Sequence, residues 1–550
     1  MQTQRNVVVL ALLTCAPASA QTLFVKHDGD LSSQKTGWTI APMSDLDGDG
    51  FGEYIVGSGG LGGYAEVISG HTGAVIYDYH EVGCYGMALG DLGDVTGDGT
   101  ADFAVGAPRE EGIGSVRIYS GADGSLEETL WGTNINGRFG YALTSAGDVD
   151  GDTIGDMIVG SFWDSTNIFE AGSATVFSGA DWSVIHHVEG DLTSEEWFGT
   201  EVCGVGDLNG DHMAEFLVGA PQQWYVPALN PPPGNVHLFD GATGNLITRF
   251  EGNNPGDHYG TSVAPLGDVN GDGTNDMVIG SPRHDENGSP VGMAEVRSGK
   301  NGIVLRRWFG TPWSMFGTSV ASAGDLDQDG FDDVIVGACH CQNTFPISGE
   351  PAYAQIFSGF DGQLLRHIEG EALASWGFAV AGLGDLTGDG IVDFGIGSPH
   401  TPTLGPETGK ALVMSGVELS LTGDRHEFSV SEGGSLALSL QAGGAHRFET
   451  YLFLSSGTGT MPGTLVAPGL VLPLMPDAFT QFTASKTNQA PYGNTLSELD
   501  IHGAGTASMT MPAGFVPAQL IGRTMWHAFI LVDEGSYTYT SNAVPLTFLP

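Results

Sequence analysis

Short apolar runs recur along the first four hundred residues, and each follows an acidic, glycine-rich stretch. The stretch "GDVNGDGTNDMVIGSP", from Gly267 to Pro282, shows the form: Asp, Asn and Gly are concentrated first, then an aliphatic run, then a Gly-Ser-Pro turn. Runs of four to eight residues rich in Val and Ile, bounded by turn residues, are typical of β-strands. Further apolar runs follow each turn, such as "NVHLFDG" and "NLITRFEG", separated by a tight turn. The pattern predicts short strands joined by turns.

The whole pattern recurs seven times at intervals of about fifty to sixty residues. Each copy has an aromatic-Gly pair such as Phe139-Gly140, then small apolar residues, the acidic stretch, and strands separated by a Gly-Ala-Pro or Gly-Ser-Pro turn. Four short strands per repeat make one propeller blade. We therefore predict an all-β fold with a seven-bladed β-propeller. A stacked solenoid is the alternative, although shorter repeats and a polar capping repeat are more typical of it.

The chain ends of the predicted propeller complete one another. The seventh repeat, "GKALVMSGVELSL", has no tight turn leading to a fourth strand, whereas "TLFVKHDGDLSS" near the N-terminus is similar to the end of the third repeat, "VIHHVEGDLTS". We expect residues 22–28 to form the outermost strand of blade seven, which leaves no open edge. The predicted propeller domain covers residues 21–416.

Residues 417–550 contain no further acidic stretch, and their texture is rich in Thr, Ser, Gly and Pro. Segments such as "FETYLFLSS" and "RTMWHAFILVDEG" predict strands of a C-terminal β-sandwich domain. The tail "SNAVPLTFLP" resembles C-terminal β-domains of secreted bacterial proteins. A sorting or surface-attachment module and a stabilising domain both remain open as its role.

The N-terminal stretch "MQTQRNVVVLALLTCAPASAQ" has the features of an export signal. Arg5 precedes an apolar run, and Ala18-Ser19-Ala20 matches a cleavage site, so residues 1–20 are predicted to be a secretory signal peptide. A lipid anchor on Cys15 is the alternative, but Thr14 is larger than such signals prefer. We expect a secreted or cell-surface protein without a membrane span, and a periplasmic location stays open.

The charge of the chain narrows the class of its partners. Asp and Glu number 65 against 18 Lys and Arg, a net charge of −47. Such a chain repels nucleic acid and anionic lipid surfaces, and cations are its natural partners. After removal of the signal, Cys84, Cys203, Cys339 and Cys341 remain, and both disulfides and buried thiols are compatible with this count.

The acidic stretches keep oxygen-bearing residues at fixed positions counted from the first Asp. Three or four carboxylates in one turn repel one another unless a hard cation binds them, and Ca²⁺ prefers six to eight oxygen ligands. We predict up to seven Ca²⁺ ions as the cofactor. The predicted metal ligands are Asp45, Asp94, Asp148, Asp207, Asp268, Asp325 and Asp385 at position one; Asp47, Thr96, Asp150, Asn209, Asn270, Asp327 and Thr387 at position three; Asp49, Asp98, Asp152, Asp211, Asp272, Asp329 and Asp389 at position five; and Glu53, Asp102, Asp156, Glu215, Asp276, Asp333 and Asp393 at position nine.

Two other interpretations fit these stretches less well. An EF-hand needs a bidentate Glu at position twelve between helices, whereas Val or Ile stands there, inside an apolar run. Asx-rich turns without metal explain one copy readily, but not seven copies with the same register. Position six is Gly in five copies but Thr153 and His212 in the third and fourth, and we expect weaker sites there because a sharp turn with positive φ suits Gly.

The aromatic-Gly start, the acidic stretch and the Gly-Ala-Pro turn, for example Gly106-Ala107-Pro108, resemble the FG-GAP repeats of the integrin α-subunit head over residues 22–416. The resemblance implies a seven-bladed propeller with calcium between the first two strands of its blades, and a role in extracellular recognition or cell adhesion. Integrin heads carry calcium in only some blades, whereas all seven copies here have the acidic stretch. The aromatic-Gly pair is altered to Thr36-Gly37 and Trp376-Gly377 at the two ends.

The loops that follow the Gly-Ala-Pro turn vary in length and carry aromatic residues, namely Trp163, Trp224, Tyr225 and Phe345. They emerge opposite the acidic stretches, so we expect ligand recognition there, whereas Trp197 and Trp376 are expected in the core. No catalytic residue and no catalytic motif was found. The predicted function is non-catalytic recognition of an extracellular protein or glycan. A propeller-based polysaccharide lyase or hydrolase is the alternative, and the oligomeric state stays open.

Overall fold

The protein is described from a computed structural model, in which contacts divide the chain into two units. Residues 26–386 and 392–413 form one unit, and residues 1–25, 387–391 and 414–550 form the other. Beyond residue 423, only strands are described. The described residues up to that point are 20–28, 35–60, 62–164, 171–190, 196–222, 232–286, 288–342, 345–346, 351–370, 375–388, 390–400 and 408–423.

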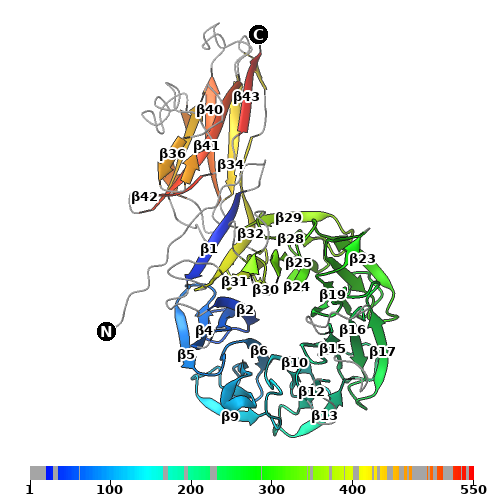
Figure 1. Cartoon of the computed structure of the whole chain (residues 1–550). Coiled ribbons are helices and arrows are strands. Elements are labelled where there is room, and N and C mark those ends of the chain that lie inside the picture. The colour runs from blue at the N-terminus through cyan, green and yellow to red at the C-terminus, as the bar shows by residue number, and fades with distance from the viewer. Residues whose placement is uncertain are drawn as a thin grey trace. The chain divides into compact units, whose positions relative to one another are not determined.

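Six blades each contain four antiparallel strands that follow one another in the sequence (Figure 1). The first strand of each blade lies on the inside of the ring and the fourth on the rim. The strands are β2 (Thr36–Met43), β3 (Glu53–Ser58), β4 (Gly63–Ser69) and β5 (Val75–Glu81); β6 (Ala88–Gly93), β7 (Asp102–Ala107), β8 (Ser115–Tyr119) and β9 (Leu126–Trp131); β10 (Ala142–Gly147), β11 (Asp156–Ser161), β12 (Ser173–Phe177) and β13 (Val184–Glu189); β14 (Glu201–Gly206), β15 (Glu215–Ala220), β16 (Asn235–Phe239) and β17 (Leu246–Glu251); β18 (Ser262–Leu266), β19 (Asp276–Ser281), β22 (Met293–Arg297) and β23 (Val304–Phe309); and β24 (Phe316–Gly324), β25 (Asp333–Ala338), β28 (Tyr353–Phe357) and β29 (Leu364–Glu369).

The loops between second and third strands contain small elements of their own. These are a 3-10 turn, η1 (Glu110–Gly112), in blade two, and two short hairpins, β20 (Asp285–Glu286) with β21 (Ser289–Pro290) in blade five and β26 (Cys341–Gln342) with β27 (Phe345–Pro346) in blade six. No α-helix occurs among the described residues. Within that part of the chain, no helix has the length and apolar character needed to cross a membrane.

Blade seven contains β30 (Ala379–Gly384), β31 (Asp393–Ser398) and β32 (Lys410–Gly423), and β1 (Ala20–Asp28) pairs with β32. The inner strands contact one another in order around the ring, and β30 contacts β2. The Thr36 amide also donates to the Thr408 carbonyl at 3.0 Å, which joins blade one to blade seven. The predicted seven-bladed propeller is therefore confirmed, while the exact domain limits stay predictions.

After residue 423 the described elements are again all strands. One sheet has the order β32-β34-β40-β38, and another has the order β33-β43-β41-β35-β39 with β42 beside β41, while β36 and β37 form a hairpin. The β-sandwich itself stays a prediction. The strands are β33 (Glu427–Ser429), β34 (Gly434–Gln441), β35 (Thr450–Ser456), β36 (Thr464–Ala467), β37 (Leu470–Leu472), β38 (Tyr492–Gly493), β39 (Leu496–Glu498), β40 (Ala504–Met511), β41 (Thr524–Asp533), β42 (Ser536–Thr540) and β43 (Val544–Leu549).

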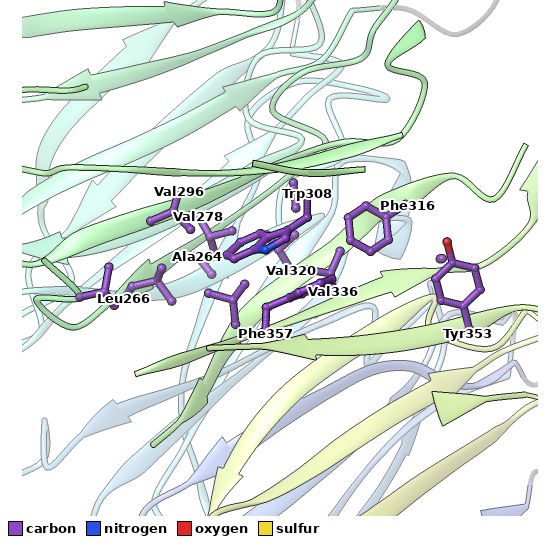
Figure 2. Close-up of a cluster of buried hydrophobic side chains, with 14 residues drawn as sticks. Ala264, Leu266, Val278, Val296, Trp308, Phe316, Val320, Val336, Tyr353 and Phe357 are labelled. Atoms are coloured by element: carbon purple, nitrogen blue, oxygen red, sulfur yellow. The ribbon is translucent and has the colours of Figure 1, made fainter. Parts of the chain in front are cut away.

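The propeller core lies between neighbouring blades. Every residue of the second strand of each blade is buried, because both faces of that strand are covered by adjacent blades. Figure 2 shows the apolar cluster between blades five and six, in which Val278 of β19 and Val336 of β25 come from opposite sides. Trp308 and Phe357 stack there with ring centroids 4.7 Å apart. Aromatic pairs of this geometry add to the stabilisation from area burial alone.

Glycine backbones meet at every junction between blades. A methyl group on the Gly of each Gly-Ala-Pro or equivalent turn would lie 2.0 to 2.4 Å from the carbonyl oxygen of the aromatic-Gly glycine in the next blade. Within blades two to five, the amide of the aromatic-Gly glycine donates to the carbonyl of the turn glycine. The seven close pairs are Gly57 with Gly86, Gly106 with Gly140, Gly160 with Gly199, Gly219 with Gly260, Gly280 with Gly317, Gly337 with Gly377, and Gly397 with Gly37.

Replacing one of these glycines should open a junction. In Gly280→Ala the new methyl group would lie 2.1 Å from the Gly317 carbonyl oxygen, so we expect the free energy of unfolding to fall by about 2 kcal/mol or more. Chemical denaturation in calcium buffer measures this. Gly62→Ala is the control, because no atom lies within 4 Å of a methyl group there. Equal stability of the two variants would contradict the close-contact account.

Candidate functional site

In blades one to six, the loop between the first and second strands wraps its backbone around the first Asp. In loop three, the Asp148 carboxylate accepts hydrogen bonds from the amides of Gly151 at 2.7 Å, Asp152 at 3.1 Å and Thr153 at 2.9 Å. The Asp152 carboxylate in turn accepts from the Ile154 amide at 2.8 Å. Such side-chain to backbone bonds favour turns over regular structure, so the acidic residues shape the loop themselves.

The position-nine carboxylate lies at the start of the second strand and is fully buried in all seven blades. It accepts the position-two amide in every loop, for example from Leu46 to Glu53 at 2.6 Å and from Leu386 to Asp393 at 3.0 Å. Burial, with the neighbouring carboxylates adding to it, raises the pKa of Glu53 to about 7 and that of Asp156 to about 6. A buried carboxylate beside others is costly without a cation.

Four loops bring three or four acidic side chains together. One oxygen from each side chain lies within 4.8 Å of the others, and each set is made of residues with the spacing and charge to hold a cation. The sets are Asp45, Asp47, Asp49 and Glu53; Asp148, Asp150 and Asp156; Asp211, Glu215 and Asp240; and Asp325, Asp327 and Asp333. The sequence predicted all of these residues as ligands except Asp240.

Loops two, five and seven have no such acidic set among the described residues. Position three is uncharged there, being Thr96, Asn270 or Thr387, so fewer carboxylates are present to gather. Asp389, the predicted position-five ligand of loop seven, lies outside the described residues. The assignment of all seven loops as calcium sites therefore stays a prediction, and the oxygen-rich donor sets of the four clusters fit Ca²⁺.

Asp240 was missed because it lies about thirty residues after the loop it joins, in the turn between the third and fourth strands of blade four. Other blades have Ser at the corresponding place, and two of these hydroxyls donate to the position-five carboxylate: Ser120 to Asp98 and Ser298 to Asp272, each at 3.4 Å. The recurring Ser-Gly or Asp-Gly pair after the third strand was the signal available in the sequence.

Thr153 and His212 adopt the backbone conformation that Gly adopts elsewhere. Their φ angles are 75° and 72°, against 93° for Gly50 in loop one. The loop shape is thus kept in both cases, although a β-branched residue in this region is strained. Whether these two sites bind calcium more weakly stays a prediction.

The end of each inner strand opposite the acidic loops carries two residues that we call the crown. One precedes the aromatic-Gly pair and the other follows the Gly-Ala-Pro or equivalent turn. The first set contains Lys35, Cys84, Arg138, Trp197, His258, Met315 and Ser375, and the second contains Gly60, Arg109, Trp163, Gln222, Arg283, His340 and His400.

A repeated hydrogen bond holds each crown pair together. In blades two to six, the amide of the second crown residue donates to the carbonyl just before the first, as from Trp163 to Gly137 at 3.2 Å. The first crown residue has a positive φ in six blades, and none of the six is Gly. Threonine hydroxyls fix some of them further, since Thr200 donates to the Trp197 carbonyl at 2.6 Å. The crown backbone therefore has a similar, strained conformation from blade to blade, whereas its side chains differ.

A cavity of about 870 Å³ runs along the inner strands of all seven blades and opens at the crown. Trp38, Arg109, Arg138, Trp163, Trp197 and Glu201 are among the residues that line it. Trp197 was expected in the core, and this was wrong: its positive φ, 55°, places the side chain against the cavity, whereas Trp376 is buried as expected. Of the loop aromatics predicted for recognition, Trp163 lines this cavity; Trp224 and Tyr225 lie outside the described residues, as does the Phe345 side chain.

Among the described residues, Cys84 and Cys203 are free thiols, and both are buried. Cys84 belongs to the crown, and burial raises the pKa of its thiol despite the nearby cations Arg109, Arg138 and Lys35. Cys203 lines the axial cavity. The buried-thiol alternative of the sequence analysis therefore holds for these two residues.

Comparison with known proteins agrees with the repeat pattern. A family model described as FG-GAP repeat matches residues 90–119, 259–294 and 316–338. Integrin alpha-5 of Xenopus laevis is 28% identical over 250 residues, covering 42% of this chain and 22% of that protein. Integrin alpha-V of Gallus gallus is 30% identical over 215 residues, covering 35% of this chain and 19% of that protein. Integrin alpha-PS2 of Drosophila melanogaster is 35% identical over 158 residues, covering 23% of this chain and 11% of that protein.

These matches span less than a quarter of each relative's length. Together with the seven blades, they support an FG-GAP β-propeller similar to the propellers of integrin α subunits. The activities and partners of the whole relatives do not transfer with a match of this extent.

Calcium should stabilise the propeller. A ligand that binds only the folded chain adds about 2.7 kcal/mol at 100 times its Kd, so the melting temperature should fall when EDTA replaces millimolar calcium. Asp272→Asn should reduce that calcium-dependent gain. Asp123→Asn is the control, because both carboxylates accept the amide two residues later but Asp123 lies in an exposed turn outside the loops. A melting temperature insensitive to EDTA would show that the loops are ordinary turns.

Glu201 should make stability depend on pH. Burial in the cavity wall raises its pKa from 4.5 to about 8, so between these values the unfolded chain loses the proton and the folded chain keeps it. Stability contributed by the neutral form therefore falls as pH rises through this window. Glu201→Gln should gain stability over the natural chain between pH 5 and pH 8, by about 1.4 kcal/mol or more. A stability difference that is constant with pH, measured by denaturant titration, would refute this.

Proposed function

We propose that this protein is a secreted, calcium-binding β-propeller that recognises an extracellular protein or glycan at its crown, without catalysis. The observation that carries the proposal is the contrast between the two ends of each inner strand. One end repeats the same acidic loop in strict register, and the other presents different side chains from each blade around a cavity of about 870 Å³. Concave sites of this size are typical of ligand binding.

The crown backbone is uniform although its side chains differ. The same backbone hydrogen bond recurs in five blades, and six non-glycine residues share a positive φ. Strained residues persist where the surrounding structure holds them, and they cluster at binding and active sites. The crown is thus a rigid scaffold that presents a chosen set of side chains, which is the arrangement of many recognition surfaces.

In this proposal calcium has a structural role at the opposite end of the strands. The ions would neutralise the carboxylates of the acidic loops and fix the hairpins between first and second strands. No crown residue is a predicted calcium ligand. In this proposal, calcium therefore affects recognition only by stabilising the blades. Up to seven ions would bind, with Asp240 as an added ligand in blade four.

Export and the remaining domains are part of the same proposal. Residues 1–20 would direct secretion, residues 21–416 would form the propeller, and residues 417–550 would form an accessory β-sandwich. Similarity to integrin α subunits supports an extracellular adhesive or recognition role. The residues that match the family model lie in the propeller, and the proposal borrows no signalling role from these relatives.

An array of glycans and extracellular proteins, probed with the full chain in calcium buffer, tests the proposal. Trp197→Ala and Trp163→Ala should each weaken binding of the array ligand at least tenfold and leave calcium binding unchanged. Trp131→Ala is the matched control, because this tryptophan is 45% exposed on the rim strand β9 and does not line the axial cavity. Melting temperatures verify that each variant is folded.

Two outcomes would contradict the proposal. If the crown variants bind normally while Asp272→Ala abolishes binding in a folded protein, the functional surface is the acidic face. If the array ligand is cleaved during incubation, the propeller is an enzyme and the lyase or hydrolase alternative holds.

A further inference from the structure

Two neighbouring arginines occupy the crown where blades two and three meet. Arg109 follows the Gly-Ala-Pro turn of blade two, and Arg138 precedes the aromatic-Gly pair of blade three; both line the axial cavity. Arg109 is exposed and Arg138 is half-buried. Gly106 and Gly140, which these arginines flank, meet at this junction. Burial, and then the charge of Arg109, lowers the pKa of Arg138. Two like charges are therefore held together at the mouth of a cavity.

Neither arginine has an acidic partner among the described residues. Elsewhere in the propeller, arginines meet glutamates: Arg117 lies 2.6 Å from Glu110, and Arg297 lies 2.6 Å from Glu295. Glu201 also lines the cavity, and burial is the cause of its raised pKa. In a chain with 65 acidic and 18 basic residues, two adjacent unpaired arginines are unexpected unless they serve a ligand.

Aromatic side chains stand beside this pair. The guanidinium of Arg138 lies over the Trp163 ring, 4.8 Å from its centroid, which fixes the orientation of the charge. Trp197, from the next blade, also lines the cavity, and its buried indole N–H has no hydrogen-bond acceptor among the described residues. The site thus offers two guanidinium groups and indole rings.

We infer that the axial cavity binds an acidic sugar, with the sugar carboxylate between Arg109 and Arg138 and its ring against the indoles of Trp163 and Trp197. The inference rests on the proposed function and specifies the ligand of the same crown. Guanidinium groups bind carboxylates in bidentate fashion. A cavity of about 870 Å³ has room for more than one sugar.

The net negative charge of the whole chain favours binding of the end of an acidic glycan over binding of its middle. A net charge of −47 repels a long polyanion lying across the surface. A terminal acidic sugar brings one carboxylate to the two arginines while the rest of its chain extends away from the protein. An acidic peptide could also offer a carboxylate, but the tryptophan faces favour a sugar ring.

Calorimetric titration of the full chain in calcium buffer tests the inference with three probes. A trimer of galacturonic acid should bind, and its fully methyl-esterified form, which lacks the charge, should bind at least tenfold more weakly. Arg109→Gln and Arg138→Gln should each weaken binding of the acid trimer at least tenfold. Arg366→Gln, on the rim strand β29, is the matched control and should bind as the natural chain does.

The third probe, pentaglutamate, separates a sugar from a peptide. Binding of pentaglutamate as tight as that of the trimer, with the same dependence on both arginines, would overturn the sugar assignment. The inference also fails if the trimer does not bind, if its ester binds equally well, or if the arginine variants bind normally. If binding of the array ligand still depends on Trp163 and Trp197, these failures leave the proposed function intact. If binding of the array ligand does not depend on them, the proposed function itself is wrong.

Discussion

The close approach of glycine backbones between blades is the constraint on which the rest of the propeller depends. At all seven junctions, the turn glycine of one blade faces the carbonyl of the aromatic-Gly glycine of the next, with no room for a side chain. This contact sets the spacing of the inner strands and therefore the width of the axial cavity. It also brings the second crown residue of one blade near the first crown residue of the next, because these residues flank the two glycines in the sequence.

The second constraint is electrostatic and acts at the other end of the same strands. Each second strand begins with a fully buried carboxylate that organises the preceding loop through backbone amides. Backbone bonds lower the cost of that charge, but burial still raises the pKa of Asp333 to about 7. Positive charge at the acidic end would therefore stabilise these carboxylates. The crown has the opposite character locally, since it concentrates Arg109 and Arg138 in a strongly acidic protein.

Regular features were predictable from the sequence, and features that join distant repeats were not. Seven acidic stretches in one register predicted seven blades, and the incomplete seventh repeat predicted that an N-terminal strand would be needed. Asp240 was missed because its loop partners are distant in sequence. The sequence places Trp197 in the core because an aromatic residue next to an aromatic-Gly pair is typical of a buried, packed side chain. In the structure, a positive φ, which no local pattern predicts for Trp, turns this side chain to the cavity. The adjacency of Arg109 and Arg138 likewise arises only when blades two and three meet.

The pairing of β1 with β32 has a consequence for how the chain reaches its native state. The two strands are separated by nearly the whole propeller sequence, and closing so long a loop is entropically slow. β1 therefore cannot pair with β32 until the last repeat has been synthesised. A partly synthesised chain exposes the edges of an open arc, and only the finished chain seals them.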